Sequence, residues 1–354
     1  MPNNNYIHKG ERYMSKKVCM LVCYTPAFDS RMYHREVKSL QKEGFQITMI
    51  VPRKDGYLLD IDGKPFTNQF LESTFVYDGI KFITYDINKR AYNPKDDPLF
   101  QLGLQEEADI YQANEFASLR YGVAIKQALK SNKGKDSKLI YDSRELTPDP
   151  FSNTIDKNKL TIYMDMLLSM LKEVDYIMTV SDSIKAWYLT LNPLLPIEVI
   201  YNSPTLPTSY KPKDYSSTNL VACHEGNIFH NSGNIDKIYS ITEKCNKSIN
   251  LKFKVIGGMR YGEPLPSSTK DVIFKGWVHY TYLPNEMTDV DVGWIDLDVT
   301  NSLSHMFAMP NKFFSYLSNG VPVLVNKCSD MEKFIRDYNC GMVIDKYEPT
   351  ADDY

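Results

Sequence analysis

The sequence lacks any long hydrophobic run, and its N-terminal segment "MPNNNYIHKGERYMSKK" has no apolar core behind its charges. A membrane-spanning helix needs about 20 mostly apolar residues, and a secretory signal peptide needs a shorter apolar core, so we expect neither. Any membrane contact is therefore predicted to be peripheral, at the inner face of the membrane.

The spacing of cysteine and histidine does not match that of a redox CxxC motif or of a metal site. The six cysteines form no CxxC pair, and several lie in apolar, strand-like runs where a thiol behaves as a small hydrophobic group. We expect these thiols to be reduced and the protein to be cytoplasmic. His34, His230, His279 and His305 have no metal-ligand spacing, so we predict no metal site and no cofactor.

An excess of positive charge is also absent. Lysine and arginine number 41 against 44 aspartates and glutamates, and the basic residues are spread along the whole chain. Because no basic stripe is present, we expect no nucleic-acid partner.

What the sequence does contain is an alternation of strand-like apolar runs and helical patterns. This alternation is typical of an α/β fold with doubly wound parallel sheets, and 354 residues suit about two domains. A segment poor in apolar residues, "SPTLPTSYKPKDYSST", separates two such series. We therefore predict an N-terminal domain over 1–205 and a C-terminal domain over 206–354, with a ligand-binding cleft at the carboxyl ends of their strands.

The segment "AMPNKFFSYLSNGVPVLV" predicts a short helix followed by a strand. Pro310 suits the first turn of a helix that starts near Asn311, and Asn319 with Gly320 suits its end. The N-terminus of such a helix can bind an anion, and Lys312 adds a positive charge beside it. The alternative interpretation is an ordinary corner between helix and strand with nothing bound.

Eight segments, taken in order, form a recognisable series. In the first half of the chain they are "DSRMYHREVKSLQKEGFQITMIV", "ADIYQANEFASLRYGVAI", "YDSRELTPD" and "VDYIMTVSDSIKAWY". In the second half they are "HEGNIFHNSGNIDKI", "FKVIGG", "VIFKGWVHYTYLPNEM" and "MPNKFFSYLSNGVPVLV". Together these segments resemble the glycosyltransferases of the GT-B fold, within the large retaining group that uses nucleotide-sugar donors (glycosyl transferases group 1, family 4-like).

The resemblance implies two Rossmann-like domains that face each other across a cleft. A nucleotide-diphosphate sugar would lie on the C-terminal domain, and a glycan, lipid-linked or other hydroxyl acceptor on the N-terminal domain, without a metal. The expected role is bacterial surface polysaccharide or glycoconjugate synthesis. Relatives continue beyond "CGMVID", so we expect the C-terminal domain to be truncated at its end.

The resemblance also indicates donor-binding residues, although the match is incomplete. Two glutamates of the family correspond to Ser315 and Phe307, and a basic residue corresponds to Ser232. We expect Arg260 and Lys312 to balance the diphosphate and Ser315 to contact the ribose. The complete predicted donor set is Gly226, Ser232, Arg260, Pro310, Asn311, Lys312 and Ser315.

Candidate catalytic residues follow three predicted strands of the first domain: Asp29, Arg31, Asn114, Glu115, Arg144 and Glu145. Each has a structural alternative. Asp29 could cap the next helix, Glu115 could favour the dipole of a helix that it opens, and Arg144 could pair with Glu145.

Three functions therefore stay open. The first is an active retaining glycosyltransferase. The second is a catalytically degenerate copy that serves as a protein partner or a glycan-binding subunit. The third is a nucleotide-sugar epimerase on the same fold, although the acid/base cluster that it would need is not found in the sequence.

Overall fold

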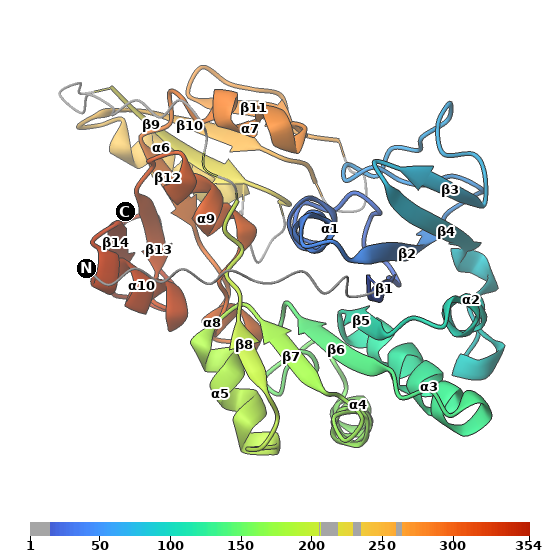
Figure 1. The fold of residues 1–354 in the computed structure, drawn as a ribbon. Coiled ribbons are helices and arrows are strands. Elements are labelled where there is room, and N and C mark those ends of the chain that lie inside the picture. The colour runs from blue at the N-terminus through green and yellow to red at the C-terminus, as the bar shows by residue number, and fades with distance from the viewer. Residues whose placement is uncertain (1–14, 205, 207–218, 229–234, 260–263) are drawn as a thin grey trace, which may run out of the picture. The chain divides into compact units, whose positions relative to one another are not determined.

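The computed structural model describes residues 15–204, 206, 219–228, 235–259 and 264–354 (Figure 1). They form an eight-stranded sheet of order β3-β4-β2-β1-β5-β6-β7-β8 and a six-stranded sheet of order β11-β10-β9-β12-β13-β14. Chain contacts divide the described residues differently, into two compact units. Unit 1 holds the residues up to Asp60 together with Pro65–Ile140, and unit 2 holds Ile61–Lys64 and the residues from Tyr141 onward.

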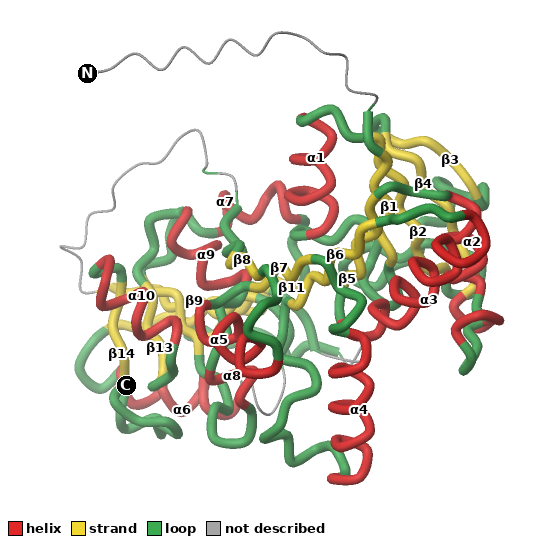
Figure 2. The backbone as a smooth tube through the Cα atoms, turned by 60° about the horizontal axis from the view of Figure 1, so that its bottom comes forward, coloured by secondary structure: helices red, strands yellow, loops and turns green. Residues whose placement is uncertain are grey.

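The first sheet is built from strands that alternate with helices along the chain. Its strands are β1 (Lys17–Leu21), β2 (Gln46–Arg53), β3 (Thr74–Tyr77), β4 (Ile80–Asp86), β5 (Ile110–Asn114), β6 (Lys138–Ser143), β7 (Tyr176–Thr179) and β8 (Ile197–Val199). The helices between them are the π-helical η1 (Met32–Val37), α1 (Lys38–Lys42), α2 (Pro98–Glu106), α3 (Phe116–Lys133), α4 (Lys157–Met170) and α5 (Asp182–Leu191). Helices α2 and α3 lie side by side in both views (Figures 1 and 2).

The second sheet repeats this architecture. Its strands are β9 (Asn219–Glu225), β10 (Asn250–Ile256), β11 (Val272–Gly276), β12 (Val292–Ile295), β13 (Val323–Asn326) and β14 (Gly341–Ile344). Its helices are α6 (Ile235–Cys245), α7 (Leu283–Glu286), α8 (Leu303–Met306), α9 (Asn311–Ser318) and α10 (Asp330–Tyr338). Among the described residues, no helix combines the length and the apolar character that a bilayer span needs.

Continuous burial explains why the sequence reads as strand-like runs. Residues 18–21 of β1 are all buried, as expected for a parallel strand covered on both faces. In α3, by contrast, the buried positions Leu119, Gly122, Ile125 and Leu129 recur every three or four residues, which is helical spacing. The prediction of parallel α/β sheets in two series is therefore confirmed.

Three local features differ from the prediction. β3 pairs antiparallel with β4 at the edge of the first sheet through the turn Asp78-Gly79, a two-residue hairpin signal that the prediction of parallel strands left out. Pro310 is the N-cap residue of α9 and not a residue of its first turn. The strand after α9 begins at Val323, whereas the apolar run "VPVLV" that predicts it begins at Val321.

The two sheets divide between β8 and β9, whereas the compact units divide at Tyr141, so the domain boundary at 205/206 stays a prediction.

Candidate functional site

Two glycine turns lie against each other at the carboxyl ends of β9 and β10. The Gly226 N–H donates to the Ile256 carbonyl at 2.8 Å, and the Ile228 N–H donates to the Gly258 carbonyl at 3.0 Å. Gly226 and Gly257 have φ values of +106° and +137°, and a Cβ on Gly257 would lie 1.9 Å from the Gly226 carbonyl oxygen. Only glycine fits this contact between Gly257 and the Gly226 carbonyl, so the two turns pack backbone to backbone.

A cation lies directly over this glycine edge. Lys312 is the second residue of α9, and its Cε and Nζ atoms are 3.7 Å from the position that a Cβ on Gly226 would take. Desolvation lowers the pKa of Lys312 to about 8, while the charge of Glu225 acts in the opposite direction. The first N–H groups of a helix have no intrahelical partner, so the start of α9 and Lys312 together favour an anion.

Helix α9 is held in this position by close packing on the sheet. A Cβ on Gly293 would lie 2.2 Å from the Tyr316 ring, so the ring rests directly on the backbone of β12. The Tyr316 hydroxyl donates to the Cys223 carbonyl of β9 at 2.9 Å. In the same compact unit, the Asn202 side chain donates to the Met309 carbonyl at 2.8 Å. These contacts fix both ends of the short helix.

Two further side chains border the glycine edge. His224 is buried, and its Nε2 lies 3.3 Å from the Asn227 carbonyl oxygen. Burial, followed by the charge of Lys312, lowers the pKa of His224 well below its usual value, so the imidazole is neutral at pH 7. The Trp277 indole packs on Gly258, where a Cβ would lie 2.3 Å from its Nε1, and 40% of Trp277 is exposed. An exposed indole at this edge offers a surface on which a flat ring can stack.

The structure therefore brings together only part of the predicted donor set. Gly226 and Lys312 meet, and Pro310 and Asn311 begin α9 beside them. Ser315 is buried within α9, with 8% of its surface exposed. Ser232 and Arg260 lie outside the described residues. The sequence reasoning did not single out Gly257 and Gly258, although the pair "GG" directly after a strand is a signal for close backbone approach.

A second polar cluster lies at the carboxyl ends of β1 and β5, within unit 1. The Asp29 carboxylate accepts from the backbone N–H groups of Arg31 at 3.1 Å and Met32 at 2.9 Å, at the start of η1, whose N-cap residue is Arg31. Asp29 therefore makes local hydrogen bonds to the backbone, and its catalytic role stays a prediction. Arg31 is only 3% exposed, and its Nε lies 2.7 Å from the Glu36 carboxylate.

Gln112 extends this cluster to the neighbouring strand. Its side-chain amide donates to Glu36 at 2.7 Å and to the Asn114 side-chain oxygen at 3.1 Å. The Asn114 amide in turn donates to the Leu21 carbonyl at 3.3 Å. Arg31 and Asn114 are therefore linked through two residues, Glu36 and Gln112, that the sequence reasoning had not placed in a site.

Glu115 lies at the same edge in an unusual backbone conformation. Its φ of 71° and ψ of 163° fall in a region that is essentially reserved for glycine. Its carboxylate accepts a hydrogen bond from the Thr25 hydroxyl at 2.7 Å. Glu115 is the N-cap residue of α3, directly before its first turn.

The remaining two candidates belong to unit 2. The Arg144 Nε lies 2.9 Å from the carboxylate of Asp142, which is fully buried, so Asp142 is the ion-pair partner of Arg144. The Glu145 side chain is exposed. In the part of the chain that the structure describes, no group of three or more His, Cys, Asp or Glu side chains is arranged to hold a metal ion.

Comparisons with known proteins agree with this architecture. Residues 230–352 match the family model described as "Glucosyltransferase 3-like, C-terminal domain". No curated protein matches the sequence significantly.

Solved structures match nearly the whole chain at low sequence identity. HepE from Anabaena in complex with UDP is 12% identical, with a TM-score of 0.60 over 93% of this chain and 85% of that chain. Sucrose-phosphate synthase from Thermosynechococcus elongatus is 12% identical, with a TM-score of 0.64 over 96% and 87%. The catalytic domain of starch synthase IV from Arabidopsis thaliana, bound to ADP and acarbose, is 11% identical, with a TM-score of 0.56 over 90% and 84%. The fold is therefore GT-B, as the resemblance implied.

Proposed function

We propose that this GT-B protein is a glycosyltransferase that moves a sugar from a nucleoside-diphosphate donor to a hydroxyl acceptor. The observation that carries the proposal is the Lys312 ammonium over the Gly226 turn at the start of α9. A helix N-terminus, a cation and a glycine turn that lets a ligand approach the backbone form a surface that suits a diphosphate.

This arrangement supplies the electrostatic part of the chemistry. When the bond between the sugar and the diphosphate breaks, negative charge develops on the leaving phosphate. The helix N-terminus and Lys312 are already oriented toward that charge, so they stabilise the transition state more than the ground state. The proposal includes no metal and no cofactor, since the nucleotide sugar is itself a substrate.

The comparisons support the proposal in two ways. The family model that matches residues 230–352 is a glucosyltransferase domain, and that range contains Lys312 and α9. Two structures of the same fold hold a nucleoside diphosphate, UDP in HepE and ADP in starch synthase IV, and the latter also holds acarbose. We therefore take UDP and ADP as the first nucleotides to test.

The finer parts of the proposal are a retaining reaction, a glycan or lipid-linked acceptor, and a role in bacterial surface polysaccharide or glycoconjugate synthesis in the cytoplasm. They rest on the sequence resemblance. Proton NMR of the first-formed product distinguishes retention from inversion, because the anomeric coupling constant differs between the two products.

The direct experiment is calorimetric titration with UDP, ADP and uridine. Lys312→Ala should weaken nucleoside-diphosphate binding by roughly 1–3 kcal/mol, the size of a charge-assisted hydrogen bond, and should leave uridine binding unchanged. Lys252→Ala is the matched control, because Lys252 is an exposed lysine of β10 near the opposite end of that strand. Absence of nucleotide binding by the wild type would contradict the proposal.

A non-catalytic partner or glycan-binding subunit is the second candidate. It is favoured by Ser315 and Phe307, which stand where the family carries glutamates. If this candidate is correct, neither the wild type nor Ser315→Glu binds UDP or ADP. If the ribose lies beside α9, Ser315→Glu should instead tighten binding, because a carboxylate accepts hydroxyl hydrogen bonds more strongly than a serine does.

A further inference from the structure

The chain segment that follows β8 contacts the start of α9. The Ile200 N–H donates to the Thr179 carbonyl of β7 at 2.7 Å, which fixes this segment to the first sheet. Two residues later, the Asn202 side-chain amide donates to the Met309 carbonyl at 2.8 Å, and both of these residues are buried. All four residues belong to unit 2. A short segment therefore joins β7 to the residue directly before Pro310, the N-cap residue of α9.

The residue between these two hydrogen bonds packs on α9 itself. The centre of the Tyr201 ring lies 5.3 Å from that of Phe314 in α9 and 5.7 Å from that of Phe334 in α10. Phe314 is buried, so the ring contact anchors the side of α9 that faces the core. An aromatic contact and a buried hydrogen bond thus act on neighbouring points of one short helix, and together they limit both its rotation and its translation.

The start of α9 needs such support from outside the helix. Its N-cap residue, Pro310, has no N–H group and forms no side-chain capping hydrogen bond. A capping side chain would bond one of the first N–H groups of α9, so its absence from Pro310 keeps this end of the helix suited to an anion. The same absence leaves the first turn without a local support. The Asn202 amide supplies the support one residue earlier, at the Met309 carbonyl.

We propose that Asn202 and Tyr201 are positioning residues of the donor site, which hold the start of α9 where Lys312 and the first N–H groups meet the diphosphate. This inference rests on the proposed function, and it assigns to the segment after β8 a role in that site. Without the Asn202 amide, the buried Met309 carbonyl loses this donor, and the start of α9 shifts toward water. Lys312 shifts as well, because it is the second residue of α9.

The titration of Lys312 reports this shift in the absence of any nucleotide. Desolvation lowers the pKa of Lys312 to about 8, while the charge of Glu225 acts in the opposite direction. Cys223 and His224 also lie near the ammonium, and both are uncharged at pH 7, because burial raises the pKa of the thiol and lowers the pKa of the imidazole. When water reaches the ammonium, the pKa of Lys312 rises toward its ordinary value. A lower stability alone leaves this pKa unchanged, because it changes the unfolded population and not the folded site.

The experiment is a carbon-13 NMR titration of the lysine Cε groups, beside a calorimetric titration with UDP at pH 7. Asn202→Leu keeps nearly the volume of the side chain and removes the donor. It should move the midpoint of the Lys312 titration to about pH 9 or above, and it should weaken UDP binding by about tenfold, the size of one charge-assisted hydrogen bond. Tyr201→Ala, at a partly exposed position, should change both quantities in the same direction. Lys312→Arg identifies the Lys312 resonance, because it removes that signal alone.

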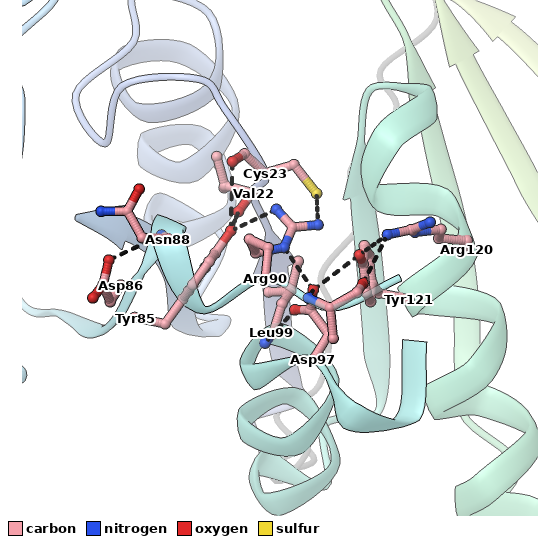
Figure 3. A network of polar contacts seen from close by, with 11 residues as sticks. Val22, Cys23, Tyr85, Asp86, Asn88, Arg90, Asp97, Leu99, Arg120 and Tyr121 are labelled. Carbon is pink, nitrogen blue, oxygen red and sulfur yellow. Dashed lines mark hydrogen bonds and ion pairs between the residues drawn. The ribbon is translucent and has the colours of Figure 1, made fainter. Parts of the chain in front are cut away.

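Tyr121→Phe is the matched control, since it also removes a buried hydrogen-bonding group. Tyr121 is buried in unit 1, and its hydroxyl donates to the Asp97 carboxylate at 3.0 Å. Figure 3 shows this contact beside Arg90, whose Nε donates to the same carboxylate at 2.7 Å. Tyr121→Phe should lower the free energy of unfolding and leave the Lys312 titration and the UDP affinity as they are in the wild type.

The two titrations separate failure of this inference from failure of the proposed function. An unchanged Lys312 titration in Asn202→Leu and Tyr201→Ala contradicts the inference, whatever the UDP affinity of these variants. The inference is also wrong if Tyr121→Phe changes the titration as much as Asn202→Leu does. If the wild type does not bind UDP but Asn202→Leu moves the Lys312 titration as expected, the segment after β8 positions α9 and the transferase proposal fails.

Discussion

The two candidate sites lie at equivalent edges of their sheets but are built differently. Both lie at the carboxyl ends of parallel strands. In unit 1 this edge is filled by side chains, where Arg31, Glu36, Gln112 and Asn114 bond to one another. In unit 2 the glycines let the two turns pack backbone to backbone, and among the described residues Lys312 lies over Gly226.

This difference teaches which ligand each edge suits. Side chains that are fixed by one another present hydrogen-bonding groups in a set geometry, which suits a ligand with directional hydrogen bonds. A glycine edge beside a helix N-terminus lets a bulky anion approach the backbone. The comparison therefore predicts that damage to the first edge changes stability and leaves nucleotide affinity unchanged, whereas damage to the second edge also lowers nucleotide affinity.

The largest effect is expected from breaking the buried pair in unit 1. Glu36→Gln removes the carboxylate that pairs with Arg31, which is only 3% exposed, and should lower the free energy of unfolding by about 3–5 kcal/mol. Urea denaturation measures the change. Asp337→Asn in the exposed Lys333–Asp337 pair of α10 is the control, and it should cost at most about 0.5 kcal/mol. Equal effects of the two variants would show that the unit 1 network contributes no more than a surface pair.

The next effect concerns the glycine edge in unit 2. Gly257→Ala places a Cβ 1.9 Å from the Gly226 carbonyl oxygen, so the two turns must move apart. We expect a loss of roughly 2–4 kcal/mol in stability, with a fall in UDP affinity. Gly276→Ala is the control, because φ is also positive there but the nearest atom is 3.9 Å away. If the free energy of unfolding falls by only about 1 kcal/mol in both variants, the close contact between the two turns is not present.

The smallest stability effect tests the strain at Glu115. Alanine is normally more stable than glycine by roughly 0.5–1 kcal/mol within regular structure. At Glu115 the order should reverse, because glycine alone adopts a φ of 71° with a ψ of 163° without strain. Glu115→Gly should therefore be about 1 kcal/mol more stable than Glu115→Ala. Lys130→Gly and Lys130→Ala, at an exposed position of α3, should show the normal order, and the same order at both positions would remove the strain argument.

Local signals were sufficient for the fold and for one part of the unit 2 site. Alternating apolar runs and helical patterns predicted both series of parallel strands, and Pro310 with Gly320 predicted where α9 begins and ends. Gly226 and Lys312 could be predicted as site residues because a glycine after a strand and a lysine at the start of a helix are both signals within one short segment of sequence.

The contacts between distant segments could not be read in the same way. Gln112 reaches Glu36 only because β1 and β5 are neighbours in a register that no local pattern reveals. Tyr316 is buried because its ring rests on Gly293, a glycine on another strand. The conformation of Glu115 is likewise set by the turn from β5 into α3. Pairings of this kind depend on sheet order, which the sequence leaves open.

The most direct test of the central claim is UDP titration at pH 7 and pH 9.5 with the wild type and Lys312→Arg. Desolvation lowers the pKa of Lys312 to about 8 in the free protein, below its ordinary value, so the ammonium is mostly charged at pH 7 and mostly neutral at pH 9.5. A diphosphate binds the charged form, so raising the pH should weaken UDP binding by about tenfold or more in the wild type.

Arginine stays charged throughout this range, so Lys312→Arg should keep nearly the same UDP affinity at both pH values. This contrast between the wild type and Lys312→Arg is the result that the account predicts. A wild-type affinity that does not change between pH 7 and pH 9.5, or a parallel fall in Lys312→Arg, would contradict the claim that Lys312 binds the diphosphate at the glycine edge.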